Sequence, residues 1–319
     1  MNQSQIEKLM HPKHIAEDVK NELIEHAHER IIKCVEVIKK WCDVNEWESR
    51  NIRKAHLASL DLYDLVCKMT VTITMNCIKP LPMASVIGMI SIPGMEKIDS
   101  IRTTSELLVL LEPIKFFKLV KMQGGTVMIC RNLAPSETLA SRMELYCYLP
   151  PLIERPDVLE HNKSSGYKTF DSDSLILGYR ENFHNKSISL DVLNTLNRNK
   201  YELDEDFIAN YEKNWHRTEQ TSEELLVEYE LQTLEDDGFK GTFQEFVQQY
   251  EQDKINWANY QEQFKVLHKH LQGNTIYLTN KVDKRGRVYA QGHHFSTQGT
   301  SFEKACINLA KKETVYGEL

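Results

Sequence analysis

Residues 276–289, IYLTNKVDKRGRVY, concentrate positive charge around a single glycine, Gly286. The charged residues are one acid and four cations: Asp283, with Lys281, Lys284, Arg285 and Arg287. Two guanidinium groups separated by one glycine can each make paired hydrogen bonds to successive phosphates. Asp283 is expected to orient one arginine or to cap the turn, and Gly286 to let the backbone turn or approach a ligand. These residue types indicate phosphate binding; the alternative is a basic surface turn whose charges are solvated.

The residues that follow extend this pattern. Gln298 and Gly299 are expected in a loop, and Thr300 or Ser301 is expected to begin an amphipathic helix that carries Phe302, Ile307 and Leu309. A loop rich in hydrogen-bond donors that leads into a helix N-terminus suits a backbone phosphate. Anion binding by this loop and by the basic turn before it is therefore one interpretation, and a solvated basic surface turn is the other.

The composition describes a soluble globular chain. Its 319 residues are 41% hydrophobic and 27% charged, with a formal net charge of −7. No stretch approaches 18 uncharged apolar residues, and the N-terminus lacks an apolar core and a cleavage site, so neither a membrane span nor a signal peptide is expected. Seven cysteines without a CxxC motif favour free thiols in a reducing, cytosolic compartment.

Twelve histidines raise the question of a metal site. Several are close in sequence, such as the pairs His268 with His270 and His293 with His294. No cysteine or carboxylate stands at a convincing ligand spacing to them, and side chains two positions apart on a helix point apart. We therefore expect no metal to be held by this chain alone.

The pattern of apolar residues predicts a chain that is mainly α-helical with small β elements, an α+β fold. Long helices are expected over residues 13–45 and 50–78, and a loop over 92–104. A further helix is expected from residue 104 to 120, interrupted at Pro113. A polar loop should run from about residue 150 to 179, followed by a helix from Ser189, the expected N-cap, to Lys200.

A β-hairpin is expected near residues 120–132. Two short β-prone runs flank Gly124 and Gly125, a glycine pair typical of a tight turn. Val127 and Met128 are the apolar residues expected near its tip. The alternative is a plain surface hairpin packed on the preceding helix.

Charge divides the C-terminal third of the chain. Residues 201–260 hold 16 Asp and Glu against 4 Lys and Arg, whereas residues 261–319 hold 5 against 9. The simplest interpretation of the acidic block is a pair of solvated helices. The functional alternative is a surface that repels nucleic acid and faces a basic protein partner.

Residues 276–315 resemble the segment around the D-x-x-G-R motif of the single-subunit, phage-type RNA polymerases. In that family an aromatic strand leads into Asp-x-x-Gly-Arg-Val-Tyr, then Asn-Pro-Gln-Gly, then a helix. The matching positions here are Asp283, Gly286, Arg287, Val288, Tyr289, Gln298, Gly299, Leu309, Ala310 and Lys311, and Arg285 matches an arginine that many members carry. Thr297 stands where the family has proline.

Weaker similarities occur upstream in the same order. LDVLNTLNRNKYEL (190–203) is similar to a family helix, and YCYLPPLIERPD (146–157) and SSGY (164–167) resemble the proline-rich loop before it. The hairpin at Gly124 and Gly125 falls where the family places a hairpin that intercalates at the upstream edge of melted DNA. The resemblance covers roughly residues 104–319, and residues 1–100 match nothing in the family.

The resemblance implies a cupped-right-hand polymerase fold, of which this chain would supply the N-terminal domain and the start of the palm and thumb. The implied divisions are a helical domain (1–200), an acidic thumb-like region (201–270) and a template-contact segment (271–319). The implied nucleic-acid contacts are Arg285, Arg287, Lys281, Lys284, Gly286, Asp283, Tyr289, Gln298 and Gly299. Gly124, Gly125, Val127 and Met128 would form the upstream-DNA hairpin.

The family's metal-binding aspartates and nucleotide-binding residues lie downstream of the D-x-x-G-R segment. The resemblance therefore implies the smaller subunit of a split, two-subunit DNA-directed RNA polymerase of the kind that Schitoviridae phages carry, acting in the cytoplasm of an infected bacterium. A second chain would supply the catalytic aspartates and bind Mg²⁺. Template DNA, nascent RNA and a single-stranded-DNA-binding accessory factor are the other implied partners. A stand-alone DNA-binding regulator derived from a polymerase fragment, and an artificially truncated polymerase, are the alternatives.

Overall fold

The computed structural model describes residues 1–172, 174–178, 187–211, 220–235 and 237–312. They form a mixed α and β structure, as the sequence predicts. The chain divides into two compact units: Lys8–Cys147, here called the N-terminal unit, and Met1–Glu7 with Tyr148–Leu319, the C-terminal unit. The expected helical domain of residues 1–200 therefore spans parts of both units. No helix in the described residues is long and apolar enough to cross a membrane.

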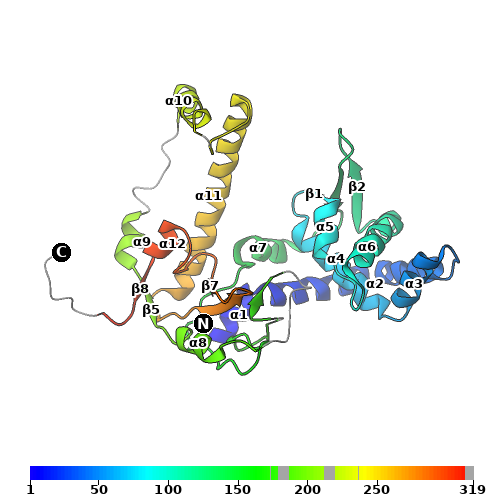
Figure 1. Cartoon of the computed structure of the whole chain (residues 1–319), viewed down its shortest axis with the longest axis horizontal. Helices are drawn as coiled ribbons and strands as arrows, with labels where there is room; N and C mark the ends of the chain where they lie inside the picture. Colours follow the sequence, from blue (N-terminus) through cyan, green and yellow to red (C-terminus); the bar gives the residue numbers. More distant parts are fainter. Residues whose placement is uncertain (173, 179–186, 212–219, 236, 313–319) are drawn as a thin grey trace. The chain divides into compact units, whose positions relative to one another are not determined.

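The N-terminal unit is a helical assembly beside a small antiparallel sheet (Figure 1). The sheet has the order β1-β3-β2, and the two central helices, α2 and α4, bury most of the apolar core with α6. The elements are α1 (Gln3–Met10, which begins in the other unit), α2 (Pro12–Cys42), α3 (Glu48–Ala58), α4 (Leu62–Asn76), β1 (Leu81–Pro82), α5 (Met83–Met89), α6 (Lys97–Leu111), η1 (Glu112–Ile114), β2 (Phe117–Lys121), β3 (Val127–Arg131) and α7 (Glu137–Tyr146).

Two of the expected helices differ from those observed. The expected helix 50–78 is two helices, because Asp61 caps the start of α4 by accepting a hydrogen bond from the backbone N–H of Asp64 at 3.1 Å. The expected loop 92–104 is also wrong, since α6 already begins at Lys97. The helix expected to reach residue 120 ends at Leu111; Pro113 lies in the 3₁₀ turn and Lys115 turns the chain with φ +67°.

The C-terminal unit carries a parallel pairing of β4 with β6, an antiparallel β6–β7 hairpin, and a separate β5–β8 pair. Figure 1 labels β5, β7 and β8 of this unit. A long helix, α11, extends from this unit, and α10 packs on its first turns. The elements are β4 (Ile176–Leu177), α8 (Leu190–Leu196), β5 (Tyr201–Leu203), α9 (Glu205–Tyr211), α10 (Ser222–Thr233), α11 (Phe243–Leu271), β6 (Thr279–Asp283), β7 (Val288–Gln291), α12 (Ser301–Ala305) and β8 (Ile307–Leu309).

The amphipathic helix expected after residue 300 is the largest error of the sequence prediction. α12 has only five residues, and Ile307–Leu309 continue as strand β8, which pairs antiparallel with Tyr201–Leu203. The acidic block also differs in detail, since its described residues (201–211, 220–235 and 237–260) contain three helical segments, α9, α10 and most of α11, rather than a pair. The helix expected from Ser189 to Lys200 ends earlier, at Leu196, with Ser189 at the N-cap.

Candidate nucleic-acid interface

The β6–β7 hairpin positions the basic segment. Its turn is a three-residue loop in which Gly286 N–H donates to the carbonyl of Asp283 at 3.0 Å. The ladder resumes with Asp283 N–H donating to the carbonyl of Arg287 at 2.8 Å. Gly286 has φ +82°, which a side chain would strain, although a Cβ there would meet no other atom. The glycine is therefore required by the backbone of the turn rather than by close packing.

Asp283 organises the tip of this hairpin. One carboxylate oxygen accepts the backbone N–H of Arg285 at 2.8 Å and of Arg287 at 3.0 Å. The other accepts the Nε–H groups of the same two arginines, at 3.2 and 2.9 Å, and the hydroxyl of Tyr289 at 3.3 Å. The sequence left open whether this acid caps the turn or orients an arginine, and the structure shows that it does both.

The electrostatics of Asp283 follow from these contacts. Partial desolvation acts to raise its pKa, but the hydrogen bonds and charge of Arg287, with the bond from Tyr289, lower the pKa below the ordinary value. The pKa of Arg287 is raised in turn, chiefly by its hydrogen bond to Asp283. The carboxylate is thus held in its charged form, and it fixes both arginines by their Nε atoms.

Both arginines remain open to solvent. The side chains of Arg285 and Arg287 are 71% and 54% exposed, whereas that of Asp283 is 14% exposed. Arg285 also places an Nη atom 3.1 Å from Asp283. Because the carboxylate engages the Nε edge of each guanidinium and the side chains stay largely exposed, the remaining Nη donors are oriented and accessible in a geometry that suits phosphate.

The two lysines of the segment have different positions. Lys284 is exposed in the turn beside Arg285. Lys281 is half-buried on β6, and its Nζ donates to the hydroxyl of Ser172 at 2.8 Å. Lys284 therefore belongs to the exposed tip, whereas Lys281 holds β6 against the loop that contains Ser172.

Gln298 and Gly299 support the hairpin from the following loop. The side-chain oxygen of Gln298 accepts the N–H of Ala290 at 2.9 Å, and its nitrogen donates to the carbonyl of Val288 at 3.1 Å. The amide thus occupies the free edge of β7 as a neighbouring strand would. A Cβ at Gly299 would lie 1.7 Å from the carboxylate of Glu303, so glycine leaves room for that carboxylate.

The start of α12 does not have the phosphate-binding character that the sequence suggests. Thr300 and Glu303 form a capping box in which the Glu303 carboxylate accepts the N–H of Thr300 at 2.8 Å. Tyr260 donates its hydroxyl to the other oxygen of Glu303 at 3.1 Å. A fixed carboxylate at this helix end repels a phosphate, so the start of α12 does not extend the exposed cationic tip of β6–β7.

The β2–β3 hairpin lies in the other unit and confirms the expected turn. Its strands pair antiparallel from Phe117 with Arg131 to Lys121 with Val127, and both Gly124 and Gly125 have positive φ, +93° and +88°. Val127 and Met128, expected near the tip, are half-buried within the strand.

The apolar residue at the tip of this hairpin is Met122, which is 52% exposed. Lys118 and Lys121 are exposed on the adjacent strand. Sequence reasoning missed all three, although counting back from the glycine pair would have placed Met122 at the first position of the turn.

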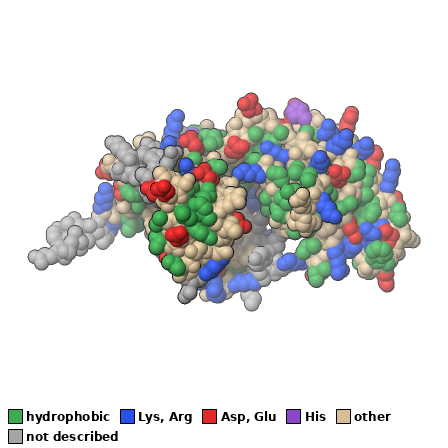
Figure 2. Space-filling view, turned by 90° about the horizontal axis from the view of Figure 1, so that it is seen from above, with side chains coloured by type: hydrophobic (Ala, Val, Ile, Leu, Met, Phe, Trp, Pro, Cys, Tyr) green, Lys and Arg blue, Asp and Glu red, His purple; other side chains and the backbone are tan. Residues whose placement is uncertain are grey.

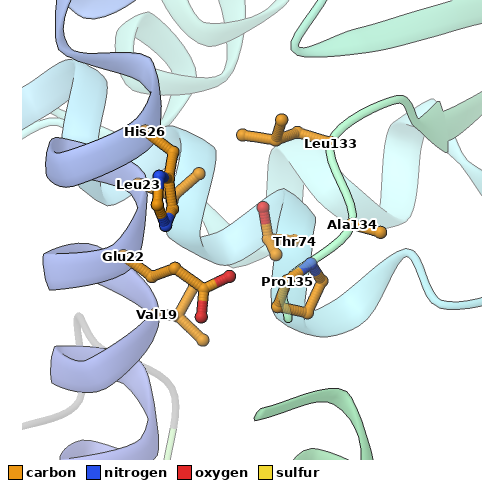
Figure 3. A pocket seen from close by; sticks show the side chains of 8 residues that line it. All are labelled: Val19, Glu22, Leu23, His26, Thr74, Leu133, Ala134 and Pro135. Carbon is orange, nitrogen blue, oxygen red and sulfur yellow. The ribbon is translucent and has the colours of Figure 1, made fainter. Parts of the chain in front are cut away.

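A small hollow in the N-terminal unit is unsuited to a substrate. Figure 3 shows it between α2 and the segment before α7, and its volume is about 40 Å³, room for little more than water. The carboxylate of Glu22 accepts the hydroxyl of Ser136 at 2.8 Å and also its backbone N–H, so it anchors the start of α7. The lining residues are Val19, Glu22, Leu23, His26, Thr74, Leu133, Ala134 and Pro135.

Among the residues that the structure describes, no three histidine, cysteine or acidic side chains converge as metal ligands. No protein-family model matches the chain, and no curated protein matches it significantly in sequence. The resemblance to the phage-type polymerases therefore rests on the sequence motifs alone and stays a prediction.

Proposed function

We propose that this chain is the smaller, non-catalytic subunit of a two-subunit, phage-type DNA-directed RNA polymerase. The β6–β7 tip contacts the template strand or its hybrid with nascent RNA, beside an active centre on the partner chain. The partner supplies the carboxylates that bind Mg²⁺ and carry out nucleotide transfer.

The observation that supports the proposal is the arrangement around Asp283. A basic surface turn does not need a carboxylate to orient its cations, because water can hydrogen-bond to the exposed lysines and arginines. Here one carboxylate with a lowered pKa accepts five hydrogen bonds and fixes Arg285 and Arg287 with their guanidinium groups exposed. Pre-positioned donors lose little entropy when they bind phosphate, which favours a contact that must hold a strand in register.

The charge of the whole chain favours a partner. Affinity for nucleic acid rises with the number of phosphates neutralised, and a protein that binds DNA alone spreads many cations along its footprint. This chain carries −7 in total, and its oriented basic tip is small. We therefore expect the purified chain to bind DNA weakly and to synthesise no RNA with or without magnesium, and its one-to-one complex with the catalytic subunit to extend RNA on single-stranded DNA.

Arg287→Ala in that complex tests the contact itself. We expect a sharp loss of transcription initiation, unchanged assembly with the partner, and a salt dependence of DNA binding that is about one unit shallower per lost phosphate contact. Arg198→Ala, at an exposed arginine elsewhere in the same unit, is the matched control. RNA synthesis by the chain alone, or unchanged activity of Arg287→Ala, would contradict the proposal; tight DNA binding by the chain alone would favour the stand-alone regulator.

A further inference from the structure

Helix α10 exposes an apolar stripe that the proposed function does not use. Val227, Leu231 and Leu234 are 56%, 60% and 82% exposed. Their spacing of four and three positions aligns them on one face of the helix, with Leu234 at its C-cap. Three neighbouring aliphatic side chains held in water at one face are unfavourable unless something covers them.

The opposite face of α10 is already packed. Leu225 is 5% exposed and lies in a cluster with Phe246 and Tyr250 of α11. Tyr229 donates its hydroxyl to the carbonyl of Gly241 at 3.1 Å, and Thr221 with Glu224 forms a capping box at the helix start. Helix α10 is therefore held against α11 by its buried face. The exposed apolar stripe is a second face of the helix that takes no part in this packing.

Acidic side chains border the stripe on both sides. At 3.6 residues per turn, Glu223 and Glu230 fall along one edge, and Glu224 and Glu228 fall along the other. In the described part of residues 220–240 there are six acidic residues and one basic residue, Lys240. The view onto the α10 end of the unit shows apolar side chains gathered with acidic ones at their edge (Figure 2).

The apolar stripe and its acidic border together determine which class of partner can bind. The acidic border repels the phosphates of nucleic acid, so the surface cannot extend the template contact of the β6–β7 tip. An apolar stripe with helical spacing fits the apolar side of another helix, and a border of glutamates is complementary to lysine and arginine.

We propose that Val227, Leu231 and Leu234 with their bordering glutamates, here called the α10 surface, dock a partner protein through a basic amphipathic helix. The partner segment offers apolar anchors three and four positions apart, flanked by lysine or arginine. Three anchors make a small interface, so the contact is a weak and salt-sensitive one. It is independent of the polymerase proposal, because it needs neither DNA nor catalysis.

A labelled peptide of leucine and lysine, patterned as an amphipathic helix of about 18 residues, tests this with the full-length chain by fluorescence anisotropy. We expect saturable one-to-one binding that weakens as salt rises. The triple variant Val227→Ser, Leu231→Ser, Leu234→Ser should weaken binding by about tenfold or more, since it removes the anchors without touching the core. Ile255→Ser, at an exposed apolar residue of α11, is the matched control and should bind as the wild type does.

Two further measurements make the outcome decisive. Glu223→Lys with Glu230→Lys should weaken the leucine–lysine peptide and strengthen a leucine–glutamate peptide of the same pattern. Sedimentation of the chain over a range of concentrations identifies self-association. Equal peptide binding by the wild type and the triple variant would overturn the proposal, and so would dimerisation that the triple variant abolishes, because the occupant would then be a second copy.

Discussion

The two hairpins have turns of the same length, with a glycine at the equivalent position, but their first residues differ in chemistry. In β2–β3, Gly125 N–H donates to the carbonyl of Met122, and Met122 N–H donates to the carbonyl of Thr126. In β6–β7, Gly286 and Asp283 make the equivalent pair of bonds, with Arg287 in the place of Thr126. The first position of the turn is therefore a thioether in one hairpin and a carboxylate in the other.

The first residue affects what each tip can present, together with the cations that only the β6–β7 turn carries. A carboxylate accepts several hydrogen bonds, so Asp283 gathers the backbone and guanidinium donors of Arg285 and Arg287 into one arrangement. A thioether is a poor acceptor, so Met122 leaves an apolar side chain exposed at its tip. The β6–β7 turn thus combines cations with a carboxylate that orders two of them, whereas the β2–β3 turn has neither and exposes an apolar side chain.

Removing the carboxylate should have the largest effect. Asp283→Ala raises the net charge of the tip, yet we expect about a hundredfold slower initiation by the reconstituted two-subunit enzyme, because both arginines lose their charge-assisted restraint. The initiation rate of Asp283→Asn should lie between those of the wild type and Asp283→Ala, since the asparagine amide oxygen can still accept the backbone N–H groups. Initiation at the wild-type rate in Asp283→Ala would mean that the order of the tip is irrelevant.

Acid should destabilise the unit that carries β6–β7. His294 follows β7, is 1% exposed, and its Nδ1 has no hydrogen-bond partner. Burial, with the nearby His293, lowers its pKa to about 3. In the unfolded chain it takes up a proton below about pH 6.5, so the stability it provides is complete above that pH and falls as the pH drops towards 3.

We expect a loss of about 2 kcal/mol in the unfolding free energy of the C-terminal unit between pH 7.5 and pH 5. Hydrogen exchange measured separately on the two hairpins, corrected for the intrinsic rate, checks this: β6–β7 should lose protection and β2–β3 should not. His294→Phe should flatten the pH dependence, whereas His28→Gln in the N-terminal unit should leave it unchanged. Equal loss in both hairpins would refute a local cause.

A negative charge at the apolar tip of β2–β3 should slow transcription on duplex DNA but not on single-stranded DNA. If β2–β3 wedges against an unstacked base pair, as the family resemblance implies, Met122→Glu should slow transcription on duplex DNA about tenfold and leave single-stranded templates within about twofold. Gln123→Glu adds the same charge one position away and controls for electrostatics alone. Identical losses on both templates would leave β2–β3 as a plain surface hairpin.

The smallest expected effect is that of removing the Gln298 side chain, which hydrogen-bonds to the edge of β7. Gln298→Ala removes two hydrogen bonds to the Val288 and Ala290 backbone, which water can partly replace at this exposed edge. We expect a loss of about 1 kcal/mol in stability and faster exchange of the Ala290 amide. Gln123→Ala, at the tip of the other hairpin, should change neither quantity. Unaltered exchange at Ala290 would show that the glutamine does not brace the strand.

The sequence determined the features that depend on a few neighbouring residues. The turn at Gly124 and Gly125 was predicted, because a glycine pair that tolerates positive φ acts locally. At Gly286 the sequence left open whether the backbone turns or approaches a ligand, and the structure shows a turn. The N-cap at Thr300 follows the same local rule, whereas Ser189 begins α8 without a side-chain capping hydrogen bond. For Asp283 the sequence offered two local roles, and the structure shows both.

Tertiary structure decided the features that depend on distant partners. Ile307–Leu309 have apolar residues compatible with a helix, yet they pair as a strand with Tyr201–Leu203, about a hundred residues earlier, because backbone hydrogen bonds and burial there outweigh weak local propensity. Lys281 is one of four cations close together in sequence, but it lies half-buried on β6 and bonds to Ser172, 109 positions away, so it is not part of the exposed tip. Spacing along the chain cannot show which cation meets a distant hydroxyl, since that depends on how the loop folds back against β6.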